Sequence, residues 1–359
     1  MIAVARNKQV VFGTGPVGSS VARLLQSAGH EVLAIPTSEY GSDPKGVKVY
    51  HGDPADFEFV LTACADASAI FLCLNGPPSQ WAEMYPPVVD NAIRVAASTG
   101  AKLIHWDLAH VYGATREPID ESTPNSAKTG PARVMIDLAD KIINATWKRE
   151  ISGVVGRSAD VYGPGAVGPE FGSSFGGKFF WSALEDEKIT IVGDMDAPRS
   201  VAYVDDVARG LIKLAEEPQS VGHVWHLPCD RPISPVEMVH LLANETTSAS
   251  EVGGTPRHVR GCPLMQLKVV NPDVNELQHE LHSLDRPFVL DHSMFTSMFG
   301  QKVTEHEEAI RQSLNWYREH PRPVDESIFE KAFEKMPRVA RTSRFMKRLG
   351  ACAYSLVRT

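Results

Sequence analysis

A glycine-rich turn between an apolar run and a helix-like segment constrains this chain more than any other feature. Residues 10–12 are apolar, Gly13-Thr14-Gly15-Pro16-Val17-Gly18 follows, and a helix-like segment occupies residues 17–28. In such a turn the first glycine permits the tight bend, the second lets backbone approach a pyrophosphate, and the third lets helix and strand pack closely. The N–H groups and dipole at the helix start favour phosphate, and Pro16 gives up an N–H that has no intrahelical partner. These six residues predict a dinucleotide site.

Strand-like and helix-like runs alternate through the first half of the chain. The expected strands are residues 9–13, 31–35, 47–50, 69–74, 102–107 and 151–157. The expected helices between them are residues 17–28, 54–65, 81–99 and 131–148. Strands that alternate with helices, and that are apolar along their length, predict an α/β fold with a Rossmann-type doubly wound parallel sheet covered on both faces.

The pattern changes at the loop-forming run Gly163-Pro164-Gly165. Beyond it, helices are expected at residues 173–187, 205–216 and 234–243, and strands at 199–203 and 221–227. We interpret residues 1–165 with about 199–230 as the dinucleotide-binding domain. Residues 166–198 with about 231–320 are interpreted as a smaller, partly interleaved substrate lobe, and residues 321–359 as a basic tail.

The tail between residues 338 and 359 contains basic residues and no acidic one: Arg338, Arg341, Arg344, Lys347, Arg348 and Arg358. Apolar residues at helical spacing suggest an amphipathic helix, which could contact a membrane surface or a partner. We favour a helix packed on the protein's own surface, because one short helix rarely anchors a protein.

Bulk composition narrows the class of partner. The formal net charge is −8, so there is no basic excess of the kind that nucleic acid attracts. Five cysteines without a Cys-x-x-Cys pair suggest reduced thiols, and neither a secretory leader nor a bilayer-length apolar run is evident. We therefore expect a cytoplasmic monomer or homodimer that binds a small-molecule substrate, with no metal and no nucleic acid.

Further motifs carry a family resemblance over about residues 8–319. They are Gly52-Asp53-Pro54-Ala55-Asp56, Val111-Tyr112-Gly113, Arg157-Ser158-Ala159-Asp160-Val161-Tyr162-Gly163-Pro164-Gly165 and Arg199-Ser200-Val201-Ala202-Tyr203-Val204-Asp205-Asp206-Val207-Ala208. With the glycine turn, they make the chain resemble the extended and atypical short-chain dehydrogenase/reductase superfamily, in its NAD-dependent epimerase/dehydratase-like branch. The resemblance implies an NAD(P)-dependent oxidoreductase or epimerase-like enzyme.

The same resemblance implies roles for individual residues. Asp53, with Pro54 beside it, matches the aspartate that usually contacts adenine, and Leu74-Asn75 matches the segment that passes the cofactor's ribose and phosphates. Asp160 and Arg199 match positions that commonly face substrate. Without the resemblance, Asp53 could equally cap a helix, and Arg199 could be an ordinary surface ion-pair residue.

The residues at the end of the second strand determine whether the site accepts the 2′-hydroxyl of NAD or the 2′-phosphate of NADP. An acidic residue there would bind the ribose 2′-hydroxyl of NAD, whereas the chain reads Pro36-Thr37-Ser38. Small hydroxyl residues at Thr37 and Ser38 leave room for a 2′-phosphate, although no arginine stands beside them. The sequence thus leans towards NADP.

The superfamily's usual catalytic groups are missing. The resemblance implies a Tyr-x-x-x-Lys pair with a nearby Ser or Thr, in which the lysine lowers the tyrosine's pKa for proton exchange during hydride transfer. No tyrosine of this chain is followed by lysine four residues later, and Leu108 stands at the Ser/Thr position, four before Tyr112. Where the pair belongs, residues 130–137 read Gly-Pro-Ala-Arg-Val-Met-Ile-Asp.

Other polar residues are candidates to replace them. His110 occupies the place where related dehydratases carry a glutamate base, so it could do acid–base work near neutral pH. Tyr112 and Tyr203 could donate hydrogen bonds to an oxyanion, and Asp107 could orient His110 or hold a ribose. Each could instead be structural. A further loop residue, Trp81, either walls the substrate pocket or stiffens its loop.

Three functions remain open from the sequence. The first is an NAD(P)-binding epimerase/dehydratase-like enzyme with a non-standard proton donor, acting on a small organic molecule such as a biosynthetic intermediate. The second is a non-redox isomerase, lyase or cyclase that reuses the pocket. The third is a non-catalytic NAD(P) sensor.

Overall fold

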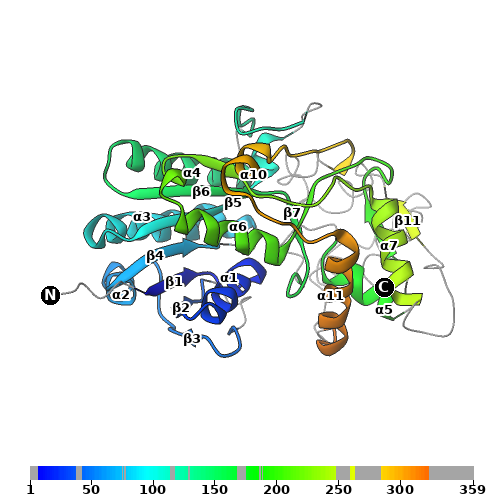
Figure 1. The fold of residues 1–359 in the computed structure, drawn as a ribbon, viewed down its shortest axis with the longest axis horizontal. Coiled ribbons are helices and arrows are strands. Elements are labelled where there is room, and N and C mark those ends of the chain that lie inside the picture. The colour runs from blue at the N-terminus through cyan, green and yellow to red at the C-terminus, as the bar shows by residue number, and fades with distance from the viewer. Residues whose placement is uncertain are drawn as a thin grey trace, which may run out of the picture.

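The computed structural model describes residues 7–37, 43–74, 76, 78–113, 118–127, 130–167, 175–185, 187, 189–247, 259–262 and 284–322. Its centre is a seven-stranded parallel sheet with the order β10-β6-β5-β4-β1-β2-β3 (Figure 1). The strands are β1 (Lys8–Phe12), β2 (Glu31–Ile35), β3 (Lys48–Val49), β4 (Ala67–Leu72), β5 (Lys102–Leu108), β6 (Ser152–Ser158) and β10 (Val224–His226). This arrangement confirms the predicted α/β class with a doubly wound parallel sheet.

Helices cover both faces of the sheet. α1 (Pro16–Ser27) packs against α6 (Val204–Glu216), whereas α3 (Trp81–Thr99) packs against α2 (Phe57–Ala63) and α4 (Gly130–Trp147). The interior strands are buried along nearly their whole length, as expected for a sheet covered on both sides. The strand order reverses between β1 and β4. In open α/β sheets such a switch point is where a crevice forms beyond the carboxyl ends of the strands.

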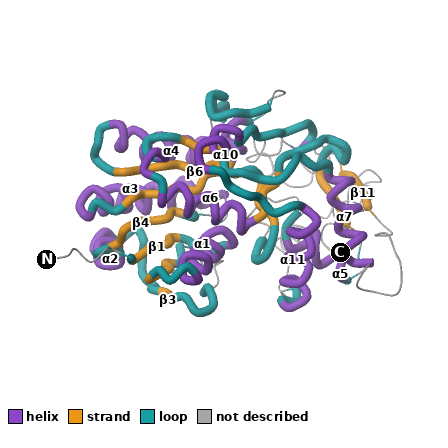
Figure 2. The backbone as a smooth tube through the Cα atoms, viewed as in Figure 1, coloured by secondary structure: helices purple, strands orange, loops and turns teal. Residues whose placement is uncertain are grey.

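A second group of elements lies at the end of the molecule away from β3 and α2 (Figures 1 and 2). It contains α5 (Gly177–Leu184), α7 (Pro235–Thr247) and α11 (His306–Glu319), which pack on one another, and the parallel pair β8 (Ile189–Val192) and β11 (Val259–Cys262). Further elements are the parallel pair β7 (Asp160–Tyr162) and β9 (Val201–Tyr203), and α10 (Ser293–Phe299), which packs on β10. The proposed domain boundaries stay a prediction.

Most predicted elements are found close to their expected positions. The helix at residues 81–99 is α3 with identical bounds, and the second strand at residues 31–35 is β2. The helix expected at residues 173–187 is shorter, because extended backbone at Gly176 sets its start at Gly177.

The tail after residue 322 lies outside the described residues, as do Ser38 and Asn75. Within the described ranges, no helix is both long and apolar enough to cross a bilayer.

Candidate functional site

The turn from β1 into α1 is closed by backbone contacts that only glycine permits. Gly13 has φ +93°, and a Cβ there would lie 2.1 Å from the carbonyl oxygen of Cys73. A Cβ at Gly18 would lie 1.9 Å from the carbonyl oxygen of Gly13. Strand, turn and helix are therefore packed backbone to backbone, as a close approach to a diphosphate requires.

Some polar groups at the start of α1 have no hydrogen-bond partner among the described side chains. Gly15 is the N-cap in extended conformation, no side chain caps the helix, and Pro16 follows. Thr14 is 3% exposed, and its Oγ1 has no hydrogen-bond partner in the described part of the chain. A buried polar atom without a partner is costly, so a ligand oxygen at this point would satisfy it. These residues fit a diphosphate at the helix N-terminus.

The residues predicted to contact the cofactor's adenosine, ribose and phosphates follow β2, β3 and β4. Thr37 follows β2 and is partly exposed, and Leu74 is buried just after β4. Asp53 is exposed, and its Oδ1 accepts a hydrogen bond from the Ala55 N–H at 2.8 Å. The cap of α2 is Asp56, so Asp53 is not needed as a helix cap.

The other side of the α1 start borders a small cleft with about 280 Å³ of empty space, including the part open to solvent. Its lining residues are Pro16, Val17, Trp106, Leu108, Asp160, Val161 and Ala166. Lys102 on β5 reaches the carbonyl groups at the end of α6, so the even-numbered side chains of β5 lie on the α6 face. Trp106 and Leu108 share that face and present no hydroxyl to the cleft.

Asp107 lies on the opposite face of β5 in a buried ion pair. Its Oδ2 accepts hydrogen bonds from Arg157 Nε at 2.8 Å and Nη2 at 2.7 Å, and its Oδ1 accepts from the Leu108 N–H. Both residues are almost fully buried. Whereas the sequence predicted a carboxylate that orients His110 or holds a ribose, the observed contacts bind Asp107 to Arg157 and to its own backbone.

Tyr112 joins the same buried group. Its hydroxyl lies 2.7 Å from His226 Nε2, and the Arg157 guanidinium stands over its ring at 4.8 Å. Burial raises the pKa of Tyr112, with the Arg157 charge opposing the shift. His226 Nδ1 lies 2.8 Å from the carbonyl oxygen of Asp291. Tyr112 therefore stabilises the junction of β5, β6 and β10, and it is not among the residues lining the cleft.

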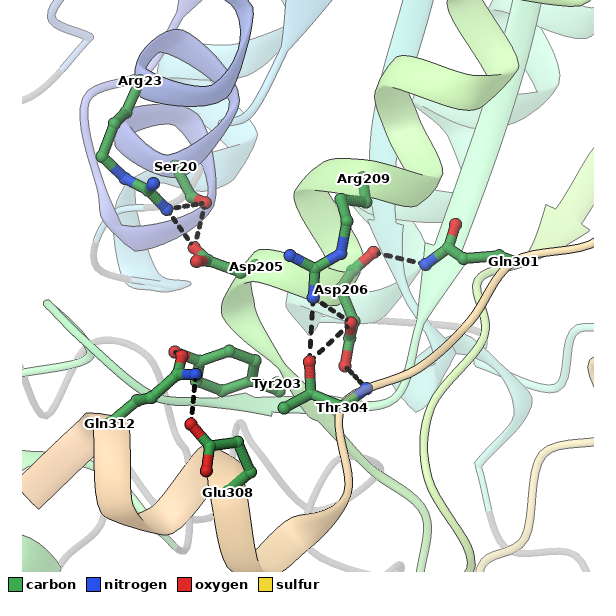
Figure 3. A network of polar contacts seen from close by, with 10 residues as sticks. All are labelled: Ser20, Arg23, Tyr203, Asp205, Asp206, Arg209, Gln301, Thr304, Glu308 and Gln312. Carbon is green, nitrogen blue, oxygen red and sulfur yellow. Dashed lines mark hydrogen bonds and ion pairs between the residues drawn. The ribbon is translucent and has the colours of Figure 1, made fainter. Parts of the chain in front are cut away.

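Tyr203 belongs to a network that ties α6 to α11 (Figure 3). Its hydroxyl donates to Gln312 Oε1 at 2.8 Å, and the amide of Gln312 donates to Glu308. In the same network, buried Asp206 accepts hydrogen bonds from the backbone N–H and the hydroxyl of Thr304. The predicted oxyanion donor is thus engaged with α11 in this structure.

His110 lies in the 3₁₀ turn Ala109–Tyr112 directly after β5. The side chain is only partly accessible, and burial lowers its pKa to about 4, with the Asp107 charge opposing the shift. The imidazole is therefore neutral at pH 7 and able to accept a proton.

The three predicted substrate residues lie in different surroundings. Asp160 lines the cleft, and its contact with substrate stays a prediction. Arg199 is buried and donates from Nη2 to the carbonyl oxygens of Asp194 and Leu284. Trp81 donates its indole N–H to the carbonyl oxygen of Gly76 at 2.7 Å, which favours the loop-stiffening role.

Trp106 was not singled out in the sequence, although it lines the cleft. Its indole N–H donates to Ser158 Oγ at 2.9 Å, and it is 3% exposed. Period-2 alternation from Leu108 would have placed it on the cleft side.

No group of three or more His, Cys, Asp or Glu side chains suited to a metal occurs among the described residues.

A parallel sheet with a diphosphate cradle at its switch point defines a Rossmann-type nucleotide-binding protein. The sequence model of the NAD dependent epimerase/dehydratase family matches residues 10–227, well over half of the chain. The chain belongs to this family, which is a family of enzymes. A search of curated proteins gave no match.

Solved structures share the fold at low sequence identity. WbmH from Bordetella bronchiseptica, solved with NAD+, is 20% identical with a TM-score of 0.66, covering 88% of this chain and 99% of its own. DesIV, a dTDP-glucose 4,6-dehydratase from Streptomyces venezuelae solved with NAD and TYD, is 18% identical with a TM-score of 0.70, covering 87% and 97%. UDP-glucose 4-epimerase from Thermotoga maritima, solved with UDP-glucose, is 18% identical with a TM-score of 0.71, covering 87% and 99%.

Proposed function

We propose that this chain is an NAD(P)-binding epimerase/dehydratase-like enzyme that acts on a small organic molecule. The observation that carries the proposal is the cradle at the start of α1. There Gly13 and Gly18 leave no room for a Cβ, and Thr14 Oγ1 lacks a partner among the described residues. Two structures of the same fold, WbmH and DesIV, contain the cofactor NAD.

We propose NADP rather than NAD as the preferred form. The described residues that follow β2 are Pro36 and Thr37, and neither is the acid that would bind a 2′-hydroxyl. The small Thr37 side chain leaves space for a 2′-phosphate.

The reacting groups differ from the superfamily's pattern. Leu108 supplies no hydroxyl, and the start of α4 buries Ala132, Met135 and Ile136 where the resemblance places the tyrosine and lysine. A bound nicotinamide would supply hydride chemistry. His110 follows the strand that supplies Trp106 and Leu108 to the cleft but is not itself among the lining residues. We propose that its neutral imidazole accepts the substrate proton, and that Asp160 contacts the substrate from the cleft wall.

The first test is equilibrium binding of NADP+ and NAD+ to the full-length chain, followed by substrate screening at 340 nm, where reduced nicotinamide absorbs. We expect micromolar or tighter binding, with NADP+ preferred. Absence of binding by either cofactor would refute the proposal.

The proton role is tested by His110→Ala beside His223→Ala, which changes an exposed histidine directly before β10. We expect kcat to fall about 100-fold or more in the first variant, as is typical for loss of a general acid or base. The control should retain activity. Equal activity in both variants would remove His110 from the mechanism.

A non-redox isomerase, lyase or cyclase is the second candidate. It is favoured by the cleft itself, whose lining, among the residues that the structure describes, includes the carboxyl group of Asp160 but no hydroxyl side chain. Turnover of substrate without any change in nicotinamide absorbance would select it. Cofactor binding with no turnover of any substrate would point instead to a sensor.

A further inference from the structure

The turn that follows β7, residues 163–167, forms part of one wall of the cleft. Ala166 lines the cleft from this turn, and Pro16 and Val17 line it from the first turn of α1. A methyl group at Gly165 would lie 3.8 Å from the Cα of Pro16, so the backbone of the turn lies close against the helix. The position of the turn therefore sets the width of the cleft beside the diphosphate cradle.

The backbone of this turn has a conformation that glycine permits. Gly163 has φ +129° and Gly165 has φ +79°, values that L side chains rarely adopt. Inside the turn, the Ala166 N–H donates to the carbonyl oxygen of Gly163 at 3.2 Å, and the Val167 N–H donates to that of Gly165 at 2.9 Å. These bonds close the turn locally, so its place relative to α1 depends on contacts with other elements.

Tyr317 on α11 attaches the turn from behind. Its hydroxyl lies 3.2 Å from the carbonyl oxygen of Gly163 and 3.0 Å from that of Ala166, so one proton is shared between the two ends of the turn. The carbonyl of Ala166 also accepts from the Gly177 N–H at 2.6 Å. The buried Tyr317 ring stacks on Phe180, with ring centroids 4.8 Å apart. Replacing Tyr317 with phenylalanine would keep this stacking and remove only the hydroxyl contacts.

Neighbouring contacts place α11 relative to α1 (Figure 3). Tyr203, which directly precedes α6, donates to Gln312 on α11. At the start of α6, Asp205 accepts a hydrogen bond from Arg23 on α1 at 2.6 Å. Because α1 is held to α6 and α6 to α11, the Tyr317 hydroxyl has a defined position relative to the diphosphate cradle.

The turn lies on the nicotinamide side of the proposed cofactor site. In a doubly wound fold the diphosphate lies at the start of the first helix, and the adenosine half lies on the side of the second strand. Thr37 follows that strand, whereas the turn shares its cleft with Trp106 and Leu108 of β5. A shift of the turn should therefore affect the nicotinamide half of a bound dinucleotide more than its adenosine half.

We propose that Tyr317 is a positioning residue for the nicotinamide half of the cofactor. Its hydroxyl holds residues 163–166 against the first turn of α1, and so fixes the wall from which Ala166 faces the bound ligand. Tyr317 acts through the turn. The inference rests on the proposed dinucleotide site and assigns to α11 a part in shaping it.

Binding to full-length Tyr317→Phe tests the inference with two ligands, NADP+ and 2′-phospho-ADP-ribose, which lacks nicotinamide. If the wild type prefers unphosphorylated ligands, NAD+ and ADP-ribose take their place. In calorimetric titrations we expect NADP+ to bind about fivefold or more weakly, and 2′-phospho-ADP-ribose to stay within about twofold of wild type. The matched control is Ser313→Ala, which removes a buried hydroxyl of α11 that donates to Ala309 inside the same helix. The control should bind both ligands as wild type does.

Amide hydrogen exchange of the ligand-free protein tests the attachment itself. In Tyr317→Phe, peptides that cover residues 160–167 should exchange about tenfold or more faster, while peptides from β1 and β4 stay protected. Ser313→Ala should exchange as wild type does throughout.

A second variant perturbs the turn from its other side and serves if Tyr317→Phe does not fold. Gly165→Ala adds a methyl group that faces Pro16 and strains a residue with φ +79°. It should weaken NADP+ relative to 2′-phospho-ADP-ribose, as Tyr317→Phe does. Gly46→Ala carries the same φ of +79° beside the Gln26 side chain and should leave the ratio of the two affinities unchanged.

Each outcome decides the inference. A folded Tyr317→Phe variant that binds both ligands like wild type, or keeps residues 160–167 protected, overturns it. An equal loss of affinity for both ligands also overturns it, because a general loss of stability does not distinguish nicotinamide from the rest of the ligand. The same holds if Ser313→Ala shifts the ratio as strongly. If wild-type protein binds no ligand of either pair, the proposed function fails, and the inference fails with it.

Discussion

The carboxyl ends of β1 and β5 lie on the same edge of one sheet. The end of β1 has the features of a phosphate-binding turn, whereas the end of β5 lacks the superfamily's usual catalytic hydroxyl. After β1, backbone contacts at Gly13 and Gly18 preserve a phosphate cradle. At the end of β5, the side chains of Trp106 and Leu108 line the cleft, and Asp107 forms a buried ion pair. Phosphate binding depends on backbone N–H groups and packing, whereas catalysis depends on single side chains that can change without disturbing the sheet. A single substitution is therefore less apt to remove the phosphate-binding turn than to remove a catalytic side chain.

The largest expected effect tests whether the charges behind β5 are structural. Arg157→Met leaves Asp107 buried without its partner, and we expect unfolding free energy to fall by about 3–5 kcal/mol in denaturant titrations. Arg133→Met breaks an exposed pair with Asp137 on α4 and should change stability by less than about 1 kcal/mol. Similar losses in both variants would contradict the structural role of the buried pair.

The cradle after β1 is tested by Gly18→Ala. Because the new Cβ would meet the Gly13 carbonyl oxygen, we expect a loss of about 3 kcal/mol and at least tenfold weaker ADP-ribose binding. Gly29→Ala, just beyond the other end of α1, has open space around it and carries only the strain of φ +88°. That control should lose about 1 kcal/mol and keep its affinity. Normal affinity in a folded Gly18→Ala variant would show that the close approach is not used.

Thr37→Asp tests whether Thr37 lies near the 2′-position of the bound cofactor. A carboxylate at the end of β2 would repel a 2′-phosphate, so we expect NADP+ to bind at least tenfold more weakly, about 1.4 kcal/mol, with NAD+ little changed. Thr37→Asn has the same shape without the charge and should retain NADP+ binding. If Thr37→Asp bound both cofactors as wild type does, Thr37 would not lie near the 2′-position.

The smallest effect concerns His105, which lies with Asp107 on the face of β5 away from the cleft. It is fully buried, neither ring nitrogen has a hydrogen-bond partner among described residues, and burial lowers its pKa to about 4. His105→Leu removes an unsatisfied polar group and should raise stability by about 1 kcal/mol. His105→Asn keeps a polar group there and should give no such gain.

The same histidine gives stability a pH dependence with a definite sign. Its folded pKa lies below the ordinary 6.5, so the unfolded chain binds more protons between pH 6.5 and 4. Stability is then fully present above pH 6.5 and falls as pH drops towards 4. Both variants should reduce this slope, by up to about 1.4 kcal/mol per pH unit, in denaturant titrations at several pH values. An unchanged slope would show that His105 does not titrate in this way.

Local sequence signals predicted the sheet and its helices well. Residues 31–35 and 81–99 coincide with β2 and α3, because continuous apolar runs and helical periodicity are local signals. The sequence predicted the surroundings of some candidate site residues but not of others. Asp160 does line the cleft, but Tyr203 is engaged with Gln312, which is 109 residues away in sequence. No local pattern reveals such a contact.

The sequence alone determined the glycine turn, the parallel α/β fold and the absence of a Tyr-x-x-x-Lys pair, since these follow from residue identity and short-range spacing. Only the tertiary structure decided which polar groups are already used. It paired Asp107 with Arg157 and Tyr112 with His226, and it placed Trp106 opposite the start of α1. The physical reason is that a side chain's partner is set by how strands and helices pack, and packing joins residues far apart in the chain.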